Sequence, residues 1–190
     1  PGPPGGGEQV DHLVHRRIQL TDRIGGVVAQ PAAQHMVVRG VDGGESIEDV
    51  EDGGLRIGGM ARLADMASHS TIRERFPMLA EACDAVATPA LRNMATIGGN
   101  LCQRPRCWYL RRGISCYKNG GSDCPAVGGE NQYLAILDGG PCYIVHPSDP
   151  AVALTALDAV VEVASASGRR RIPISEFYVL PTDRLDGETV

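Results

Sequence analysis

Residues 92–109 read RNMATIGGNLCQRPRCWY, and residues 146–158 read HPSDPAVALTALD. Four widely spaced cysteines accompany these stretches, at Cys107, Cys116, Cys124 and Cys142. In residues 96–100, TIGGN, two glycines allow backbone N–H groups to approach an anion or a flavin closely. A glycine turn followed by enough thiols for one iron–sulfur cluster suggests an electron-transfer protein.

The TIGGN stretch is a weak signal when it is taken alone. It follows a plausible extended segment at residues 91–95, and Thr96 and Asn100 could add side-chain hydrogen bonds to a ligand. The simplest interpretation is a Gly-Gly turn between two strands. No Lys-Ser/Thr pair follows, so it is not a P-loop, and it does not match the GxGxxG dinucleotide fingerprint either.

The spacing of the four cysteines is the stronger signal, since eight, seven and seventeen residues separate them in turn. Zinc ribbons use short CxxC pairs, which are absent here, and only His146 lies near a suitable His–Cys spacing. Four spread thiolates suit a Cys₄ iron–sulfur site, while zinc and free or paired thiols stay open alternatives. Cys102 is a fifth candidate that can simply pack. Cys83 falls on an apolar helix face and is expected to be a buried hydrophobic residue.

The sequence His146-Pro147-Ser148-Asp149 predicts the start of a helix. Asp149 is the expected N-cap, with Pro150 in the first helical position, although Ser148 is also suited to capping. The functional interpretation is a carboxylate that bonds a ligand hydroxyl at the helix N-terminus. One residue can do both.

Composition excludes several classes of function. The 190-residue chain is 43% hydrophobic and carries a net charge of -5, so it has a core but no nucleic-acid footprint. It has no run of eighteen apolar residues to suggest a membrane span, and no signal peptide is recognised. We therefore expect a cytoplasmic protein, periplasmic only if a partner subunit carries it, whose cysteines serve metal or redox chemistry rather than disulfides.

Periodicity predicts an α+β fold. Residues 55–57 alternate like a strand, and Met60, Leu63, Ala64 and Ala67 follow helical spacing. A second helix is expected over residues 78–86, a third over 151–157, and strands near Val161 and Ile172. We expect two lobes, one containing the helices between residues 60 and 86. Residues 1–50 are expected to be poorly structured and to contribute little to the core. Residues 101–145 form a long irregular region that a metal centre would order.

The stretch RNMATIGGNLCQRPRCWYLRRG, the later cysteines and HPSDPAVALTALDAVV together resemble the FAD-binding (medium) subunit of the molybdenum hydroxylase, or xanthine dehydrogenase, family. The cysteine segment is similar to the aldehyde oxidoreductase-like branch, whose flavin subunit carries an extra [4Fe-4S] cluster. The resemblance covers residues 55–177.

The resemblance implies a truncated FAD-binding domain of the vanillyl-alcohol-oxidase (PCMH) type over residues 51–190, with a cluster insert at about 101–145. The family's C-terminal domain and its AGGT-type pyrophosphate loop are not recognised. An altered N-terminus, for instance by a reading-frame error upstream of Glu51, would explain the abrupt change in character. The implied cluster ligands are Cys107, Cys116, Cys124 and Cys142. The implied FAD-binding residues are Thr96, Ile97, Gly98, Gly99, Asn100, Ser148 and Asp149.

The implied function is electron transfer within a multi-subunit oxidoreductase. A large subunit with a molybdenum cofactor and a small subunit with [2Fe-2S] clusters are the implied partners, and no side chain of this chain needs to be catalytic. The alternative is a non-enzymatic Cys₄ module that holds an iron–sulfur cluster or zinc and no longer binds flavin. The missing pyrophosphate loop favours this alternative, whereas TIGGN and HPSD favour the flavin.

Overall fold

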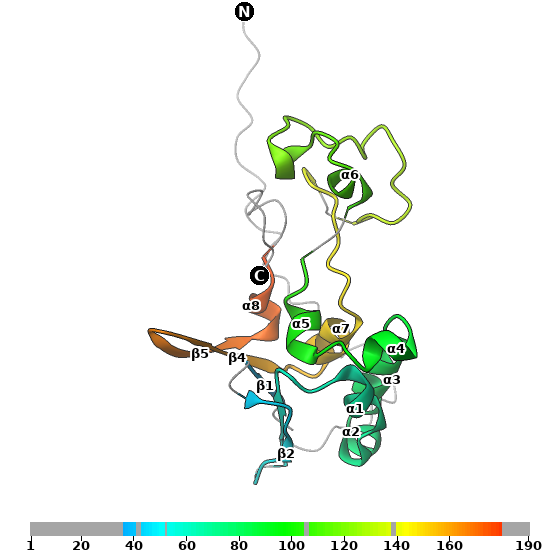
Figure 1. The fold of residues 1–190 in the computed structure, drawn as a ribbon. Coiled ribbons are helices and arrows are strands. Elements are labelled where there is room, and N and C mark those ends of the chain that lie inside the picture. The colour runs from blue at the N-terminus through cyan, green and yellow to red at the C-terminus, as the bar shows by residue number, and fades with distance from the viewer. Residues whose placement is uncertain (1–35, 41–42, 52, 105–106, 138–139, 180–190) are drawn as a thin grey trace, which may run out of the picture. The chain divides into compact units, whose positions relative to one another are not determined.

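A five-stranded mixed sheet organises the chain in the computed structural model, which describes residues 36–40, 43–51, 53–104, 107–137 and 140–179. The strands run in the spatial order β2-β3-β1-β4-β5. Their bounds are β1 Met36–Arg39, β2 Ile47–Asp49, β3 Leu55–Gly58, β4 Val160–Ser165 and β5 Gly168–Pro173. The sheet thus joins strands from both ends of the described chain (Figure 1).

Strand β1 lies at the centre of this sheet. It pairs in parallel with β3 and with β4, so that Val38 lies between Ile57 and Val161. Strands β2 and β5 add antiparallel hairpins at the two edges. Met36, Val37 and Val38 are all buried, as expected for a central parallel strand covered on both faces.

Helices follow β3 and precede β4 along the chain. Helices α1, α2 and α3 lie next to one another, and α3 packs on α7 (Figure 1). Pro77 begins α3, where its missing N–H costs no hydrogen bond. The helices are α1 Leu63–Ser68, α2 Ser70–Arg75, α3 Pro77–Ala85, α4 Pro89–Arg92, α5 Ile97–Leu101, α6 Trp108–Arg111, the 3₁₀ helix η3 Tyr117–Asn119, α7 Asp149–Ala156 and α8 Ile174–Phe177.

One hydrophobic cluster unites these elements. Leu63 of α1, Ile97 of α5 and Leu154 of α7 are fully buried in it together with Ile57 of the sheet. The prediction of two lobes is therefore wrong for the described residues. Strand β1 bridges the two halves that the sequence suggested, and this long-range pairing leaves no local periodicity to read.

Residues 36–50 also differ from expectation. The prediction that residues 1–50 contribute little to the core is wrong for Met36, Val37 and Val38, which a four-residue strand is too short to reveal by periodicity. Residues 1–35 lie outside the described residues. The strand at residues 55–57 and the helices over residues 78–86 and 151–157 are confirmed within a few residues. Met60 precedes α1 instead of belonging to it, and the strands expected near Val161 and Ile172 are β4 and β5.

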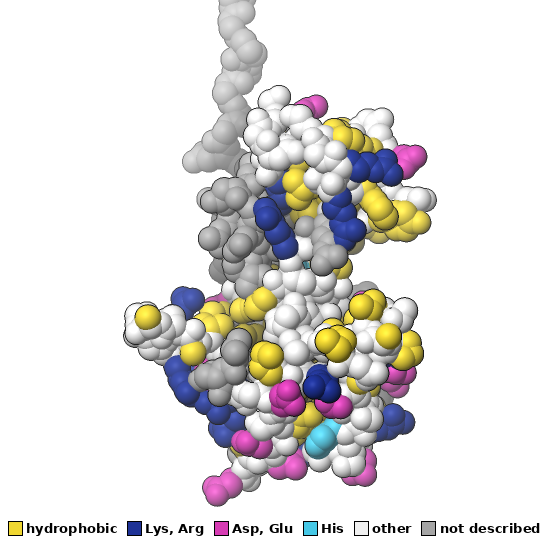
Figure 2. All heavy atoms as spheres, in the orientation of Figure 1, with side chains coloured by type: hydrophobic (Ala, Val, Ile, Leu, Met, Phe, Trp, Pro, Cys, Tyr) yellow, Lys and Arg dark blue, Asp and Glu magenta, His cyan; other side chains and the backbone are white. Residues whose placement is uncertain are grey.

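Residues 107–144, here called the cysteine-rich segment, carry only α6 and η3 as regular structure among their described residues. Of these residues only Ala126, Cys142 and Ile144 are buried, and hydrophobic side chains remain at the surface around α6 (Figure 2). No helix in the part of the chain that the structure describes is long and apolar enough to cross a membrane.

Candidate functional site

The TIGGN stretch forms the first turn of α5, not a Gly-Gly turn between strands. Thr96 is the N-cap, and its Oγ1 accepts a hydrogen bond from the backbone N–H of Gly99 at 3.2 Å. Thr96 also pairs with Arg62 in an isolated β-bridge, and the N–H of Ile97 donates to the carbonyl of Ala61 at 2.9 Å. These contacts fix the start of α5 against the chain that leaves the sheet at β3.

The two glycines of this turn have different surroundings. The N–H of Gly98 donates to the carbonyl of Gly59 at 2.8 Å, and a Cβ on Gly98 would lie 2.8 Å from that same oxygen. Gly98 is therefore required for close packing of two backbones. Gly99 is exposed, and a Cβ there would meet only Thr96 Oγ1, at 3.1 Å. Of the two, Gly99 is the exposed one.

A hydrogen bond joins the TIGGN and HPSD stretches. The Oγ of Ser148, which is 3% exposed, donates to Asn100 Oδ1 at 2.6 Å and accepts from the N–H of Ala151 at 3.2 Å. Ser148 is thus the N-cap of α7. The prediction that Asp149 is the N-cap is wrong: Asp149 is the first helical residue and Pro150 the second. The shorter hydroxyl side chain of Ser148 reaches both partners from a buried position.

This arrangement leaves polar groups available at the surface between the two helix starts. Asp149 is exposed, and among the described residues its carboxylate forms no hydrogen bond or ion pair. Asn100 uses its Oδ1 for Ser148, so its side-chain N–H₂ has no partner in the described ranges. The amide donor of Asn100 and the carboxylate of Asp149 suit the hydroxyl and phosphate groups of a flavin nucleotide, and Gly99 lets a ligand approach the backbone closely. The donor set therefore fits FAD.

His146 lies beside these residues and contacts Gln103 and Tyr178, two residues that the sequence did not single out. The ring Nε2–H of His146 donates to the carbonyl of Gln103 at 3.0 Å, and the ring centroid lies 4.4 Å from that of Tyr178. The Tyr178 hydroxyl donates to the carbonyl of Leu101 at 3.1 Å, and burial raises the pKa of this phenol. Burial lowers the pKa of His146, partly opposed by its bond to Gln103. Only the position of His146 beside Ser148 could have signalled this contact.

The four predicted cluster ligands line one small cavity. Cys107, Cys116, Cys124 and Cys142 all border a space of about 20 Å³, together with Lys118 and apolar side chains. Burial raises the pKa of the Cys142 thiol, while Lys118 lowers it. Cys83 and Cys102 do not line this cavity. Cys83 is fully buried in the core, as predicted, and burial raises its pKa to about 12.

The described residues of this region do not form a binding site for a single metal ion. Across the described ranges, no group of three or more His, Cys, Asp or Glu side chains is close enough to hold one metal ion. A tetrahedral zinc site needs its donor atoms roughly 2.0–2.3 Å from the metal, hence close to one another. The four thiols share a cavity without that convergence.

Comparison with known proteins shows the family to which this chain belongs. Residues 28–190 match the family described as "FAD binding domain in molybdopterin dehydrogenase". The chain therefore belongs to this family, and the five-stranded α/β architecture is consistent with an FAD-binding domain. The match begins well before residue 50, so the expectation that the first fifty residues do not resemble the family is wrong from residue 28 onward.

Three individual relatives from oxidoreductase complexes are similar to parts of this chain. The aldehyde oxidoreductase FAD-binding subunit PaoB of Escherichia coli (strain K12) is 41% identical over 141 residues, which cover 72% of this chain and 44% of PaoB. The glyceraldehyde dehydrogenase medium chain of Sulfolobus acidocaldarius is 27% identical over 139 residues, covering 72% of this chain and 35% of the relative. The xanthine dehydrogenase FAD-binding subunit of Escherichia coli O157:H7 is 40% identical over 52 residues, which cover 27% of this chain and 18% of that subunit. The chain spans less than half the length of each of these relatives.

Proposed function

We propose that this chain is the electron-transferring FAD subunit of a molybdenum-dependent oxidoreductase of the aldehyde or xanthine dehydrogenase type, and that it also carries a [4Fe-4S] cluster. Its partners are a large subunit with the molybdenum cofactor and a small subunit with [2Fe-2S] clusters. Its fold is a part of a PCMH-type FAD-binding domain over residues 51–190, extended at the N-terminus by β1 and β2. The observation that best supports this proposal is the Ser148–Asn100 hydrogen bond. It joins the TIGGN and HPSD stretches, 48 residues apart in the sequence, beside the exposed Asp149 carboxylate and the Asn100 amide.

The flavin is held, in this proposal, by the start of α5 and the start of α7. Thr96, Ile97 and Gly98 set the backbone of α5, Gly99 and Asn100 face the ligand, and Ser148 fixes Asn100. Asp149 supplies a carboxylate acceptor for a hydroxyl. FAD supplies the redox chemistry when bound, and the protein's contribution is to orient it. Family membership and the fit of the donor set support this assignment.

The cluster is held, in this proposal, by Cys107, Cys116, Cys124 and Cys142. A cubane spreads its four thiolates to roughly 7 Å from one another, wider than a single ion allows. The four thiols line one cavity and so supply the number of thiolates that such a cluster needs. Lys118 provides positive charge beside Cys142, which favours the thiolate form that a cluster requires.

The cluster assignment is tested on full-length protein purified without oxygen. We expect a broad absorption shoulder near about 400 nm and about four irons and four sulfides per chain. Changing Cys124 to Ser should remove most of the iron, whereas Cys102→Ser, the matched control at a cysteine outside the cavity, should keep it. Zinc in place of iron, or equal iron loss in both variants, would overturn the assignment.

The flavin assignment is tested by FAD titration of the same protein and of two variants. Since Ser148 is the N-cap, Asp149→Asn removes the charge without removing the cap. We expect Asp149→Asn to weaken FAD binding about tenfold, because a charged hydrogen-bond acceptor is replaced by a neutral one, and to cost at most about 0.3–1 kcal/mol of stability through the helix dipole. Asp158→Asn, past the end of α7, is the matched control. Equal affinity of Asp149→Asn and the parent would refute the role of this carboxylate.

A further inference from the structure

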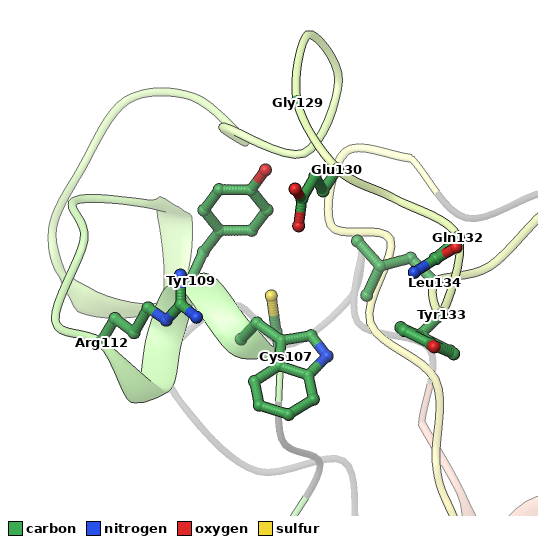
Figure 3. Close-up of a pocket in the computed structure, with 9 residues that line it drawn as sticks. Cys107, Tyr109, Arg112, Gly129, Glu130, Gln132, Tyr133 and Leu134 are labelled. Atoms are coloured by element: carbon green, nitrogen blue, oxygen red, sulfur yellow. The ribbon is translucent and has the colours of Figure 1, made fainter.

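The cysteine-rich segment contains an open cavity that neither the flavin nor the cluster uses. Its volume is about 540 Å³, within the roughly 300–1,000 Å³ typical of small-molecule sites. Helix α6 and its flanks form one wall, and the loop of residues 129–134 forms the other (Figure 3). The lining residues are Cys107, Trp108, Tyr109, Arg112, Gly129, Glu130, Gln132, Tyr133 and Leu134.

The lining favours a ligand with a flat, planar ring. Three of the chain's few aromatic side chains, Trp108, Tyr109 and Tyr133, meet here together with Leu134. Trp108 is 54% exposed and Tyr133 is 68% exposed, although such side chains are usually buried. Aromatic rings that flank an open cavity can stack on another planar ring, which covers apolar surface now in contact with water.

The polar residues that line the cavity indicate the net charge of the ligand and the hydrogen-bonding groups it carries. Arg112 and Glu130 carry opposite charges and come from opposite walls (Figure 3). Neither forms an ion pair within the described part of the chain. Their charges cancel, which favours a neutral ligand, and the Arg112 guanidinium donates to an oxygen acceptor at one end. The amide of Gln132 adds a further donor. These features suit a neutral planar ring bearing carbonyl oxygens.

The cavity also shares a wall with the four-cysteine cavity. Cys107, Tyr109 and Leu134 line both spaces. A ligand in the larger cavity would therefore lie directly against residues that border the proposed cluster. We propose that this cavity binds a quinone-class molecule, a neutral planar ring with carbonyl oxygens, stacked on Tyr133 and Trp108 and bonded by Arg112. Its service as an external electron acceptor would rest on the proposed function, but its binding does not.

The binding test uses the single tryptophan of the chain, Trp108, as the reporter. Full-length protein is titrated with duroquinone, whose fully methylated ring resists thiol addition, and Trp108 fluorescence is followed. We expect saturable quenching, with durene, the same ring without carbonyls, binding at least about tenfold more weakly, since it lacks the bond to a charged donor. Non-saturable quenching, or equal binding of durene, would overturn the proposal.

Variants locate the ligand. We expect Arg112→Met to weaken duroquinone binding about tenfold and Tyr133→Ala about threefold, both measured by equilibrium dialysis. Arg104→Met, an exposed arginine outside the cavity, is the matched control and should bind like the parent. Unchanged affinity in both cavity variants would place the ligand elsewhere and overturn the assignment. Because the titration requires neither flavin nor iron, absence of FAD binding would defeat the proposed function and leave this result standing.

Discussion

The region around the sheet buries its large hydrophobic side chains, whereas the cysteine-rich segment leaves several of them exposed to solvent. In the former, Leu55, Leu63 and Leu154 are fully buried. In the latter, Ile136 is 91% exposed and Leu137 is 83% exposed. Both regions contain large hydrophobic side chains, so the difference lies in how each region is held together.

The contrast indicates what each region needs in order to be ordered. Burying a Leu-sized side chain contributes about 1.5–3 kcal/mol, whereas ordering each residue's backbone costs about 1–2 kcal/mol. The sheet region offsets that cost with its single large core. The cysteine-rich segment buries only Ala126, Cys142 and Ile144 among its described residues, which is too little. A bound cluster would supply the missing cross-links, as the proposed function requires.

The sharpest test of this contrast makes the same Leu→Ala substitution in each of the two regions. Leu63→Ala in the core should lower the free energy of unfolding by about 2–5 kcal/mol, because it leaves a cavity in a closely packed cluster. Leu137→Ala should change it by no more than about 0.5 kcal/mol. Urea denaturation followed by far-UV circular dichroism measures both. A comparable loss from Leu137→Ala would show that the cysteine-rich segment has its own hydrophobic core.

A second test concerns the backbone packing that supports α5. Gly98→Ala should destabilise the protein by about 1–3 kcal/mol, because the new methyl group would overlap the carbonyl oxygen of Gly59, which belongs to the main chain. Gly99→Ala is the matched control and should lie within about 0.5 kcal/mol of the parent, since its Cβ meets only a side-chain oxygen. Thermal melting of the two variants side by side measures the difference. Equal melting temperatures would refute the packing role of Gly98.

A third test addresses the point where the chain returns from the cysteine-rich segment to the core. Ser148→Ala removes the N-cap of α7 and the bond to Asn100, so we expect a loss of about 1–2 kcal/mol. Asp149→Ala, one residue on, should cost only about 0.3–1 kcal/mol through the helix dipole. Chemical denaturation is again the measurement. The opposite order would restore Asp149 as the capping residue.

The smallest expected effect is a pH dependence at His146. Burial lowers the pKa of this imidazole in the folded state, while the unfolded chain keeps a value near about 6.5. The folded form therefore resists protonation, so its stabilising contribution is present above about pH 6.5 and is lost as the pH falls through the folded pKa. We expect the melting temperature to fall more steeply between about pH 7 and 5 in the parent than in His146→Gln. Parallel slopes would contradict this.

The sequence predicted those helices and strands whose formation depends on residues close together in the chain. The strand at Leu55 follows from alternation, and the helix predicted over residues 78–86 follows from helical spacing. The buried position of Cys83 follows from helical spacing in the same way. The central strand at Met36 was not foreseen, because its pairing partners lie 19 and more than 120 residues away and leave no periodic trace.

The candidate site was partly predictable for the same reason. The residues of TIGGN and HPSD were selected from the sequence, but their junction through Ser148 and Asn100 depends on the packing of α5 beside α7. The choice between Ser148 and Asp149 as N-cap depended on which side chain is buried, and composition does not report that. Tyr178 and Gln103 contact His146 only because three distant segments converge.

The position of β1 in the sheet has a consequence for synthesis on the ribosome. Met36–Arg39 emerges early and can pair with β3 almost at once, yet its other edge pairs with Val160–Glu162. Until those residues leave the exit tunnel, a strand with buried valines presents an open hydrogen-bonding edge to every neighbouring nascent chain. The whole cysteine-rich segment is translated during this interval. A pause in translation before Val160 would therefore prolong exposure of that edge.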